Sequence, residues 1–486
     1  MTPRRPAARL SKGDGASKAR RRAIYALVLA FLLGDPVGIR AYSVLTHEAI
    51  IDAAWDAGIK PLLLQRFPLS TPLQLKEAHS YAYGGCVIQD MGYYPFGSKF
   101  FSDLVHYVRA GDFVEALLRD ARNVDEYAFA LGALSHYVAD NIGHSVAVNR
   151  AVAMTYPKLE RKYGHVVTYE ENPSDHLKTE FGFDVLEVAR GRYAPDSYRS
   201  LIGFRVSNAL LARAFQQTYG IPLKSVFTNY DLAVGTYRYS ISSVIPSMTK
   251  AAWQLKKQDI QKAEPGITRR RFLFHISQSS YRKYWHEPYR RPGLGSRIIA
   301  FLIHLMPQVW IFRSFAFKMP TPATEKIFMA SFNDSLTQYE KVLHDIKLTG
   351  AVALADDNLD TGTITAPGQY FLADKTYAVL LDKLFENHFA GVTPRLRKVI
   401  LREFRGVNAA AATRRHRKDW SKVVRQAAAL QAFTPPVAPA LLAPATLAPA
   451  RPEPRSTPKP RRHRRPDTQT SKYRAHNFAD GARGGN

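Results

Sequence analysis

The stretch NVDEYAFALGALSHYVADNIGH, residues 123–144, decides the fold that we expect for this chain. Within it, His136, Asp140 and His144 follow one another at steps of four residues. On an α-helix these three side chains share one face, because each is turned by only ~40° from the one before. A single histidine is more often an ordinary core or surface residue, but two histidines and a carboxylate buried together are costly without a cation. Since imidazole and carboxylate are zinc ligands, this face predicts a metal site.

The same stretch predicts a central, largely buried helix. Asn123, with Glu126 three positions later, is typical of a capping pair at a helix start. Apolar side chains then recur at the three- and four-residue spacing of a helical stripe: Tyr127, Leu131, Leu134, Val138 and Ile142. The last three of these lie roughly opposite the metal face.

Composition indicates a globular body with polar flanks. The 486 residues are 46% hydrophobic and 12% aromatic, which suffices for one large core or two ordinary ones. The formal net charge of +27 favours anionic partners, such as acidic lipid headgroups or nucleic acid, without choosing between them. Cys86 is the only cysteine, so the chain has no disulfide framework and no cysteine-rich metal site, and its redox compartment stays open.

The N-terminal segment 1–41 is typical of a signal peptide, and we expect an exported protein, periplasmic or secreted. Arginines at 20–22 precede the apolar run AIYALVLAFLLG, which is shorter than the ~20 residues that span a bilayer. A retained membrane anchor is the alternative. Cleavage before Tyr42 would give a free α-amino group on Tyr42 and place His47 five residues later, and both groups can bind a metal.

Further candidate ligands flank the central helix. We expect helices at 46–64 and 73–83, the second ending at Gly84 and Gly85, then Asp90 in a loop rich in Gly, Pro and aromatic residues and His106 on the next helix. A polar connection, residues 154–175, leads to His176 and Glu180, a His and a carboxylate four residues apart. Taken singly, Asp90 is a normal turn residue, and a His/Glu pair at this spacing is often solvated.

In this order and spacing the motifs from Tyr42 to about Phe183 resemble the zinc-dependent phospholipase C family, which shares an all-α multi-helix fold with fungal single-strand-specific zinc nucleases. The chain departs from the family in beginning with Tyr42 rather than Trp and in a longer interval before His176, where His165 is a competing ligand. The resemblance implies three zinc ions: one on Asp90, His106, His136 and Asp140, a second on His144, His176 and Glu180, and a third on the amine and carbonyl of Tyr42, on His47 and on Asp140.

Such a cluster supports hydrolysis of phosphodiesters by an activated water. We assign Asp90 as the general base, because a carboxylate at the edge of a metal cluster can orient the attacking water. Tyr93, Tyr94 and Phe96 either line a substrate cleft or pack in the core. His79 is either a donor to a metal-bound carboxylate or a solvent-facing helix residue.

Three functions are compatible with these residues. We expect a phospholipase C that acts on phospholipid at a membrane surface; the alternatives are a single-strand nuclease and an inactive, metal-stabilised binding protein. The apolar run Ile298–Phe312 is too short to span a membrane and is either a buried helix or an interfacial segment. The oligomeric state is left open.

The predicted organisation has four parts. The signal peptide (1–41) is followed by the catalytic region (42–200), by a further helical region to which no role is assigned (201–433), and by a Pro/Ala-rich basic tail (434–486) whose composition is typical of disorder.

Overall fold

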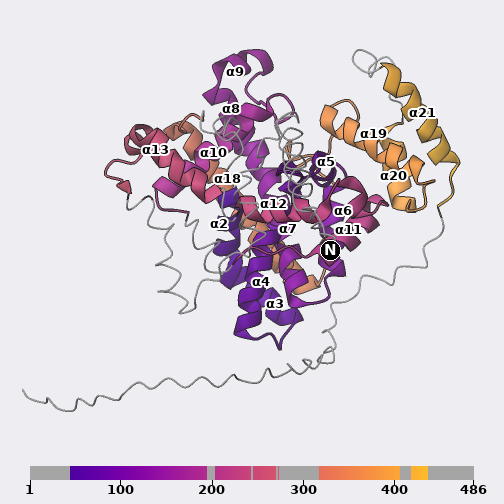
Figure 1. The fold of residues 1–486 in the computed structure, drawn as a ribbon, viewed down its shortest axis with the longest axis horizontal. Helices are drawn as coiled ribbons and strands as arrows, with labels where there is room; N and C mark the ends of the chain where they lie inside the picture. Colours follow the sequence, from indigo (N-terminus) through magenta and orange to yellow (C-terminus); the bar gives the residue numbers. More distant parts are fainter. Residues whose placement is uncertain are drawn as a thin grey trace, which may run out of the picture. The chain divides into compact units, whose positions relative to one another are not determined.

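The computed structural model describes residues 44–193, 203–241, 245–269, 272, 317–405 and 417–435. Throughout these ranges the regular elements are helical, and the β-type pairing recorded there is an isolated bridge between Asn358 and Thr363. The all-α prediction is therefore confirmed (Figure 1).

The helices follow one another in this order: α2 (Val44–Ala54), α3 (Lys60–Arg66), α4 (Pro72–Gly85), α5 (Lys99–Tyr107), α6 (Ala110–Asp120), α7 (Val124–Ile142), α8 (Asn149–Thr155), α9 (Pro157–Tyr163), α10 (Pro173–Ala189), α11 (Asn208–Tyr219), α12 (Tyr230–Tyr239), α13 (Ile245–Ala263), α18 (Pro322–Thr349), α19 (Phe371–Glu386), α20 (Pro394–Glu403) and α21 (Arg417–Ala432). Shorter turns lie between them: the π-helical η1 (Trp55–Ile59) and η3 (Gly143–Val148), and the 3-10 turns η2 (Ile88–Tyr93) and η5 (Leu223–Val226).

Helix α7 begins where the sequence predicts. The Asn123 side chain accepts a hydrogen bond from the backbone N of Glu126 at 2.9 Å, and the Glu126 carboxylate reaches back to the backbone N of Arg122. The helix is buried from Tyr127 through Asp140, which confirms a central buried element. At Gly143 the α-helix passes into η3, so the last four-residue step, to His144, crosses from an α-helix into a π-turn.

Helices α4 and α7 touch backbone to backbone. A Cβ added at Gly132 would lie 2.1 Å from the carbonyl oxygen of Ala82, and one added at Gly85 would lie 2.0 Å from that of Phe129. No residue larger than glycine fits such an approach without moving a helix. The two glycines bring the end of α4, and with it the carbonyl of Cys86, beside the metal face of α7.

Two local predictions need correction. The helix expected at 46–64 is α2, η1 and α3 in succession, and it continues past Pro61 to Arg66 because a proline in the first turn of a helix costs no hydrogen bond. The connection expected at 154–175 contains α9, which likewise begins at a proline, Pro157.

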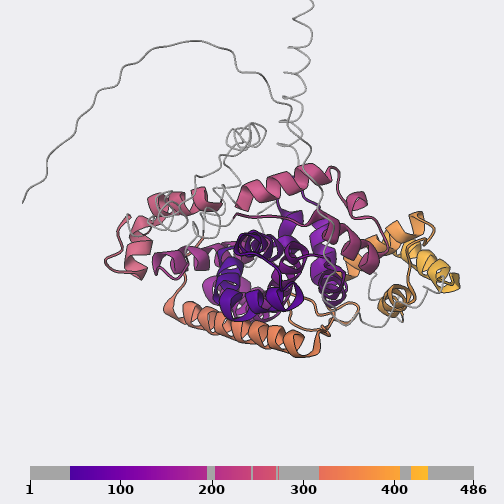
Figure 2. The same cartoon turned by 90° about the horizontal axis from the view of Figure 1, so that it is seen from below.

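The later part of the chain packs on the earlier helices. Figure 2 shows α18, in orange, lying along the first helices, and α18 contacts α2, α7 and η3. The Tyr339 hydroxyl donates a hydrogen bond to the backbone carbonyl of Leu131 at 2.8 Å. Helix α19 packs against α5, so the segment between α18 and α19 passes over the helices that carry the candidate ligands.

Several predictions lie outside the described residues. They are the signal peptide with Tyr42, the run Ile298–Phe312, and the tail from residue 436. The described residues belong to a compact unit that runs to Ala450, and the four predicted parts remain a prediction. Among the described helices, none is both long and apolar enough to cross a membrane.

Candidate metal centre

The first group of candidate ligands comes from three elements. Asp90 on η2, His106 on α5 and His136 on α7 are buried, and each offers a ligand atom within 4.8 Å of those of the other two. His106 Nε2 lies 3.4 Å from Asp90 Oδ1, and His136 Nε2 lies 3.0 Å from Asp140 Oδ2. The structure thus gathers all four residues assigned to the first ion. One detail differs, because Asp90 lies in a 3-10 turn rather than in an irregular loop.

Backbone carbonyls fix the orientation of both imidazoles. His106 Nδ1 lies 2.8 Å from the carbonyl of Ser102, and His136 Nδ1 lies 2.9 Å from the carbonyl of Cys86. A carbonyl only accepts, so each Nδ1 carries the proton and donates it. Each Nε2 then lies beside the carboxylates and is the ring nitrogen available to ligate a cation, as in a metal-ligating histidine.

The second group joins η3 to α10. His144, His176 and Glu180 are buried, with ligand atoms within 4.8 Å of one another. Glu180 Oε1 lies 3.1 Å from His176 Nδ1 and 3.5 Å from His144 Nε2. The Asn149 amide oxygen accepts from His176 Nε2 at 2.9 Å, which leaves Nδ1 of that ring for a ligand.

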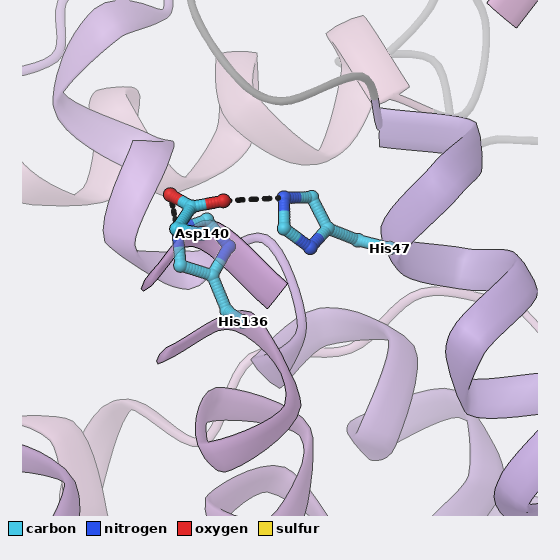
Figure 3. Close-up of side chains that lie close together, drawn as sticks. All are labelled: His47, His136 and Asp140. Atoms are coloured by element: carbon cyan, nitrogen blue, oxygen red, sulfur yellow. Dashed lines mark ion pairs between the residues drawn. The ribbon is translucent and has the colours of Figure 1, made fainter. Parts of the chain in front are cut away.

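The third group contains His47, from the first turn of α2, together with His136 and Asp140 (Figure 3). His47 Nε2 lies 3.3 Å from Asp140 Oδ1, and its ring stacks on that of His136 with 4.3 Å between centroids. Asp140 Oδ1 also lies 3.7 Å from His144 Nε2. The Asp140 carboxylate therefore touches all three groups, with Oδ2 facing the first and Oδ1 facing the other two.

The donor set fits divalent cations. Both oxygens of Glu180, Oδ2 of Asp90 and Nδ1 of His176 are buried and make no hydrogen bond among the described residues. Buried polar atoms without a partner are costly, and a cation satisfies carboxylate oxygens and imidazole nitrogens together. A mixed nitrogen and oxygen set is one of those that zinc takes in catalytic sites.

The electrostatics agree with this interpretation. Burial raises the pKa of Glu180 well above its usual value, and the charge of His144 opposes this only in part. Burial also acts to raise the pKa of Asp140, but the charges of His136 and His144 hold it well below its usual range. Asp140 is therefore ionised, and Glu180 needs further positive charge to ionise as a ligand must.

Two other histidines lie away from the centre. The exposed side chain of His165 pairs with Glu160, so it does not compete with His176. His79 is buried, stacks on Trp55 with 3.7 Å between ring centroids and pairs with Asp52. Both roles considered for His79, a donor at the metal site and a solvent-facing residue, are therefore wrong.

A cavity reaches the first and second groups. The three aromatic residues near Asp90 have different surroundings. Tyr93 lines the cavity, whereas Tyr94 packs against Tyr237 in the core and Phe96 is partly exposed. Tyr107, Tyr169 and Asp360 also line the cavity, although no sequence motif indicated them. The whole lining is Asp90, Tyr93, His106, Tyr107, Asp140, His144, Tyr169, Leu177, Glu180 and Asp360.

Histidines and carboxylates that an all-helical fold gathers in three adjoining groups are the donor set of a metal-binding protein. Residues 46–229 match the family model described as zinc dependent phospholipase C, and this part of the chain is a domain of that family. The match contains every predicted ligand except Tyr42, and it ends well before Asp360. No curated protein and no solved structure matches the chain.

Proposed function

We propose that this protein is a zinc-dependent phosphodiesterase that cleaves phospholipids in the manner of a phospholipase C. The observation that carries the proposal is the Asp140 carboxylate, which lines the cavity and joins three ligand groups inside a domain of that family. The first ion is assigned to Asp90, His106, His136 and Asp140, the second to His144, His176 and Glu180, and the third to His47, Asp140 and the terminal amine and carbonyl of Tyr42.

Bound zinc ions acidify a water molecule and stabilise negative charge on a phosphoryl oxygen. The chain supplies the orientation and the proton acceptor. Asp90 lines the cavity, its Oδ1 faces His106, and its buried Oδ2 carries no hydrogen bond within the described structure. We assign Asp90 Oδ2 as the atom that orients the attacking water and takes its proton.

The cavity and its surroundings favour a lipid over other phosphodiesters. Tyr93, Tyr169 and Leu177 give the wall an aromatic and apolar face. Large apolar side chains are also exposed on segments that carry or adjoin lining residues, and such residues suit contact with a lipid surface. They are Val146, Val166, Ile364 and Phe371, each between 38% and 57% exposed. The same aromatic rings also suit the stacking of bases, so single-stranded nucleic acid is the second candidate substrate.

Three substrates separate the candidate functions. The zinc-loaded protein is incubated with phosphatidylcholine vesicles, with single-stranded DNA, and with a small chromogenic phosphodiester. We expect vesicles to yield diacylglycerol and the phosphorylated headgroup. Cleavage of DNA without cleavage of lipid establishes the nuclease instead. Zinc binding without hydrolysis of any of the three substrates indicates a metal-stabilised binding protein.

A matched pair of variants ties the activity to the site. Asp90→Asn, which keeps the shape of the side chain but lowers its basicity, is expected to lose most turnover. His165→Ala removes an exposed histidine outside the centre and is expected to keep full activity. Equal loss in both variants contradicts the assignment of Asp90.

We also propose that the chain is exported. Support comes from the basic segment before the apolar run Ala23–Gly34 and from the family's expected use of a free terminal amine at Tyr42. N-terminal sequencing of the protein recovered from a secreting host is expected to begin at Tyr42. An intact Met1 terminus contradicts both the cleavage before Tyr42 and the third metal site.

A further inference from the structure

The segment between α18 and α19 lies against the metal centre, although it follows the family domain by more than a hundred residues. The Leu354 backbone N donates to Glu115 Oε1 at 2.7 Å, and the Tyr137 hydroxyl donates to the carbonyl of Ala355 at 2.7 Å. The Leu359 backbone N then donates to the backbone carbonyl of His106, a candidate ligand of the first group, at 3.0 Å. This last hydrogen bond ties the segment to the end of α5, beside the first ligand group.

Within this segment, Asp360 is buried and hydrogen-bonded through both carboxylate oxygens. Oδ1 lies 3.2 Å from Nδ1 of His144. Oδ2 accepts from the backbone N of Tyr169 at 2.9 Å and from the hydroxyl of Tyr370 at 2.8 Å. Because an ionised carboxylate only accepts, His144 donates from Nδ1, and its Nε2, which faces Glu180 and Asp140, is the nitrogen that would ligate a metal.

Asp360 also acts on the other histidine of the second group. The Asn149 side-chain amide donates to the backbone carbonyl of Asp360 at 2.8 Å. This bond determines which end of the amide faces His176, so the Asn149 oxygen accepts from His176 Nε2. One residue therefore sets the orientation of His144 directly and that of His176 through Asn149.

We propose that Asp360 is a positioning residue for the second zinc, and that the region following the family domain completes the metal centre. The proposal rests on the metal binding assumed in the proposed function, but not on the substrate. A carboxylate behind a metal-bound imidazole fixes its tautomer and raises its basicity, and loss of such a partner typically costs ~10–100-fold in metal affinity.

The test replaces Asp360 by asparagine in the full-length mature chain. The asparagine oxygen stays with the two donors from Tyr169 and Tyr370, so its NH₂ group faces His144. Two donors cannot pair, and His144 must then move its proton to Nε2, where it blocks the ligand lone pair. We expect the affinity for one zinc per chain to fall ~10–100-fold, measured by competition with a chromophoric chelator, while the other zinc ions stay bound.

The control is Asp357→Asn in the same segment. Asp357 accepts from the Tyr137 hydroxyl at 3.3 Å and does not line the cavity. Its variant is expected to bind zinc as the wild type does. If Asp360→Asn also keeps every zinc at the wild-type affinity, the proposal is overturned.

Cobalt substitution separates positioning from simple stabilisation. A positioning role changes the visible absorption of cobalt at one site and leaves the others unchanged. A merely structural role lowers the Tm of the metal-free protein and leaves the cobalt spectrum unaltered, which overturns the proposal. If Asp360→Asn does not fold, Tyr370→Phe removes one donor to Asp360 Oδ2 and is expected to weaken the same zinc; an unchanged zinc affinity in that variant also overturns it.

The two proposals fail separately. Wild-type protein that binds zinc but hydrolyses no phosphodiester contradicts the proposed function, and the chelator titration still decides the role of Asp360. Wild-type protein that hydrolyses lipid, with an Asp360→Asn variant of unchanged zinc affinity, contradicts only the role of Asp360.

Discussion

Replacing Gly132 by alanine tests whether the contact between α4 and α7 shapes the metal centre. The new Cβ would lie 2.1 Å from the carbonyl oxygen of Ala82 and 2.9 Å from the backbone N of Cys86. Both atoms belong to the backbone of a helix end and cannot rotate away. The helices must therefore separate by roughly 1 Å to restore an ordinary contact.

The magnitude follows from two opposing effects. Alanine favours a helix over glycine by ~1 kcal/mol, whereas overpacking costs ~1–3 kcal/mol, and the upper end applies because the atoms met are backbone. We expect a net loss of ~2 kcal/mol in the free energy of unfolding. The same shift lengthens the 2.9 Å hydrogen bond from His136 Nδ1 to the Cys86 carbonyl, so zinc binding is also expected to weaken.

Urea unfolding of the metal-free protein measures the first effect, and a zinc titration measures the second. Gly235→Ala is the matched control, because Gly235 lies inside α12 with nothing within 4 Å of an added Cβ. That variant is expected to gain ~0.5–1 kcal/mol from helix propensity alone. A Gly132→Ala protein as stable as the wild type, or more stable, would refute the close approach of the two helices.

Three further predictions concern the ligands and the later helices. His136→Ala removes an imidazole that borders two of the ligand groups and is expected to abolish both metal loading and turnover; a variant with full activity would exclude His136 from the site. Residues added ahead of Tyr42 are expected to weaken the third zinc by blocking the terminal amine, and unchanged kinetics in the extended protein would show that the terminus is not a ligand. Burial and a hydrogen bond to Asp374 raise the pKa of Glu403 to about 8. Because folding raises this pKa, the folded protein keeps a proton on Glu403 that the unfolded chain releases above about pH 4.5. The free energy of unfolding is therefore highest below about pH 4.5 and falls as the pH rises through about 8. Thermal melts between pH 5 and 9 are expected to show this fall in the wild type and a flatter profile in Glu403→Gln, and parallel profiles would contradict the shift.

Features set by neighbouring residues could be predicted from the sequence. The start of α7 depends on Asn123 and the residues up to Glu126, and the shared face of His136 and Asp140 depends only on helical geometry. These local relations survive in the folded chain. The ligands from different elements are nevertheless brought together only by tertiary packing, such as the contact of Asp90 on η2 with His106 on α5.

Features that depend on distant residues could not be predicted from the sequence. Asp360 lies in the acidic, turn-rich stretch ADDNLDTGT, and such a stretch is usually a solvated loop. Nothing in its local pattern indicates that it meets His144. The π-turn that carries His144 was missed for a similar reason, since a helical periodicity does not distinguish i+4 from i+5 hydrogen bonding over so few residues.

The hydrogen bond between His144 and Asp360 joins residues 216 positions apart. Contacts of such long sequence separation form late and slow the folding of a chain, because loop-closure entropy must be overcome first. During synthesis, His144 and His176 of the second group cannot reach their final orientation until the chain has emerged from the ribosome as far as Tyr370. The second ligand group therefore reaches its final orientation only after synthesis of a segment that lies more than a hundred residues beyond the family match.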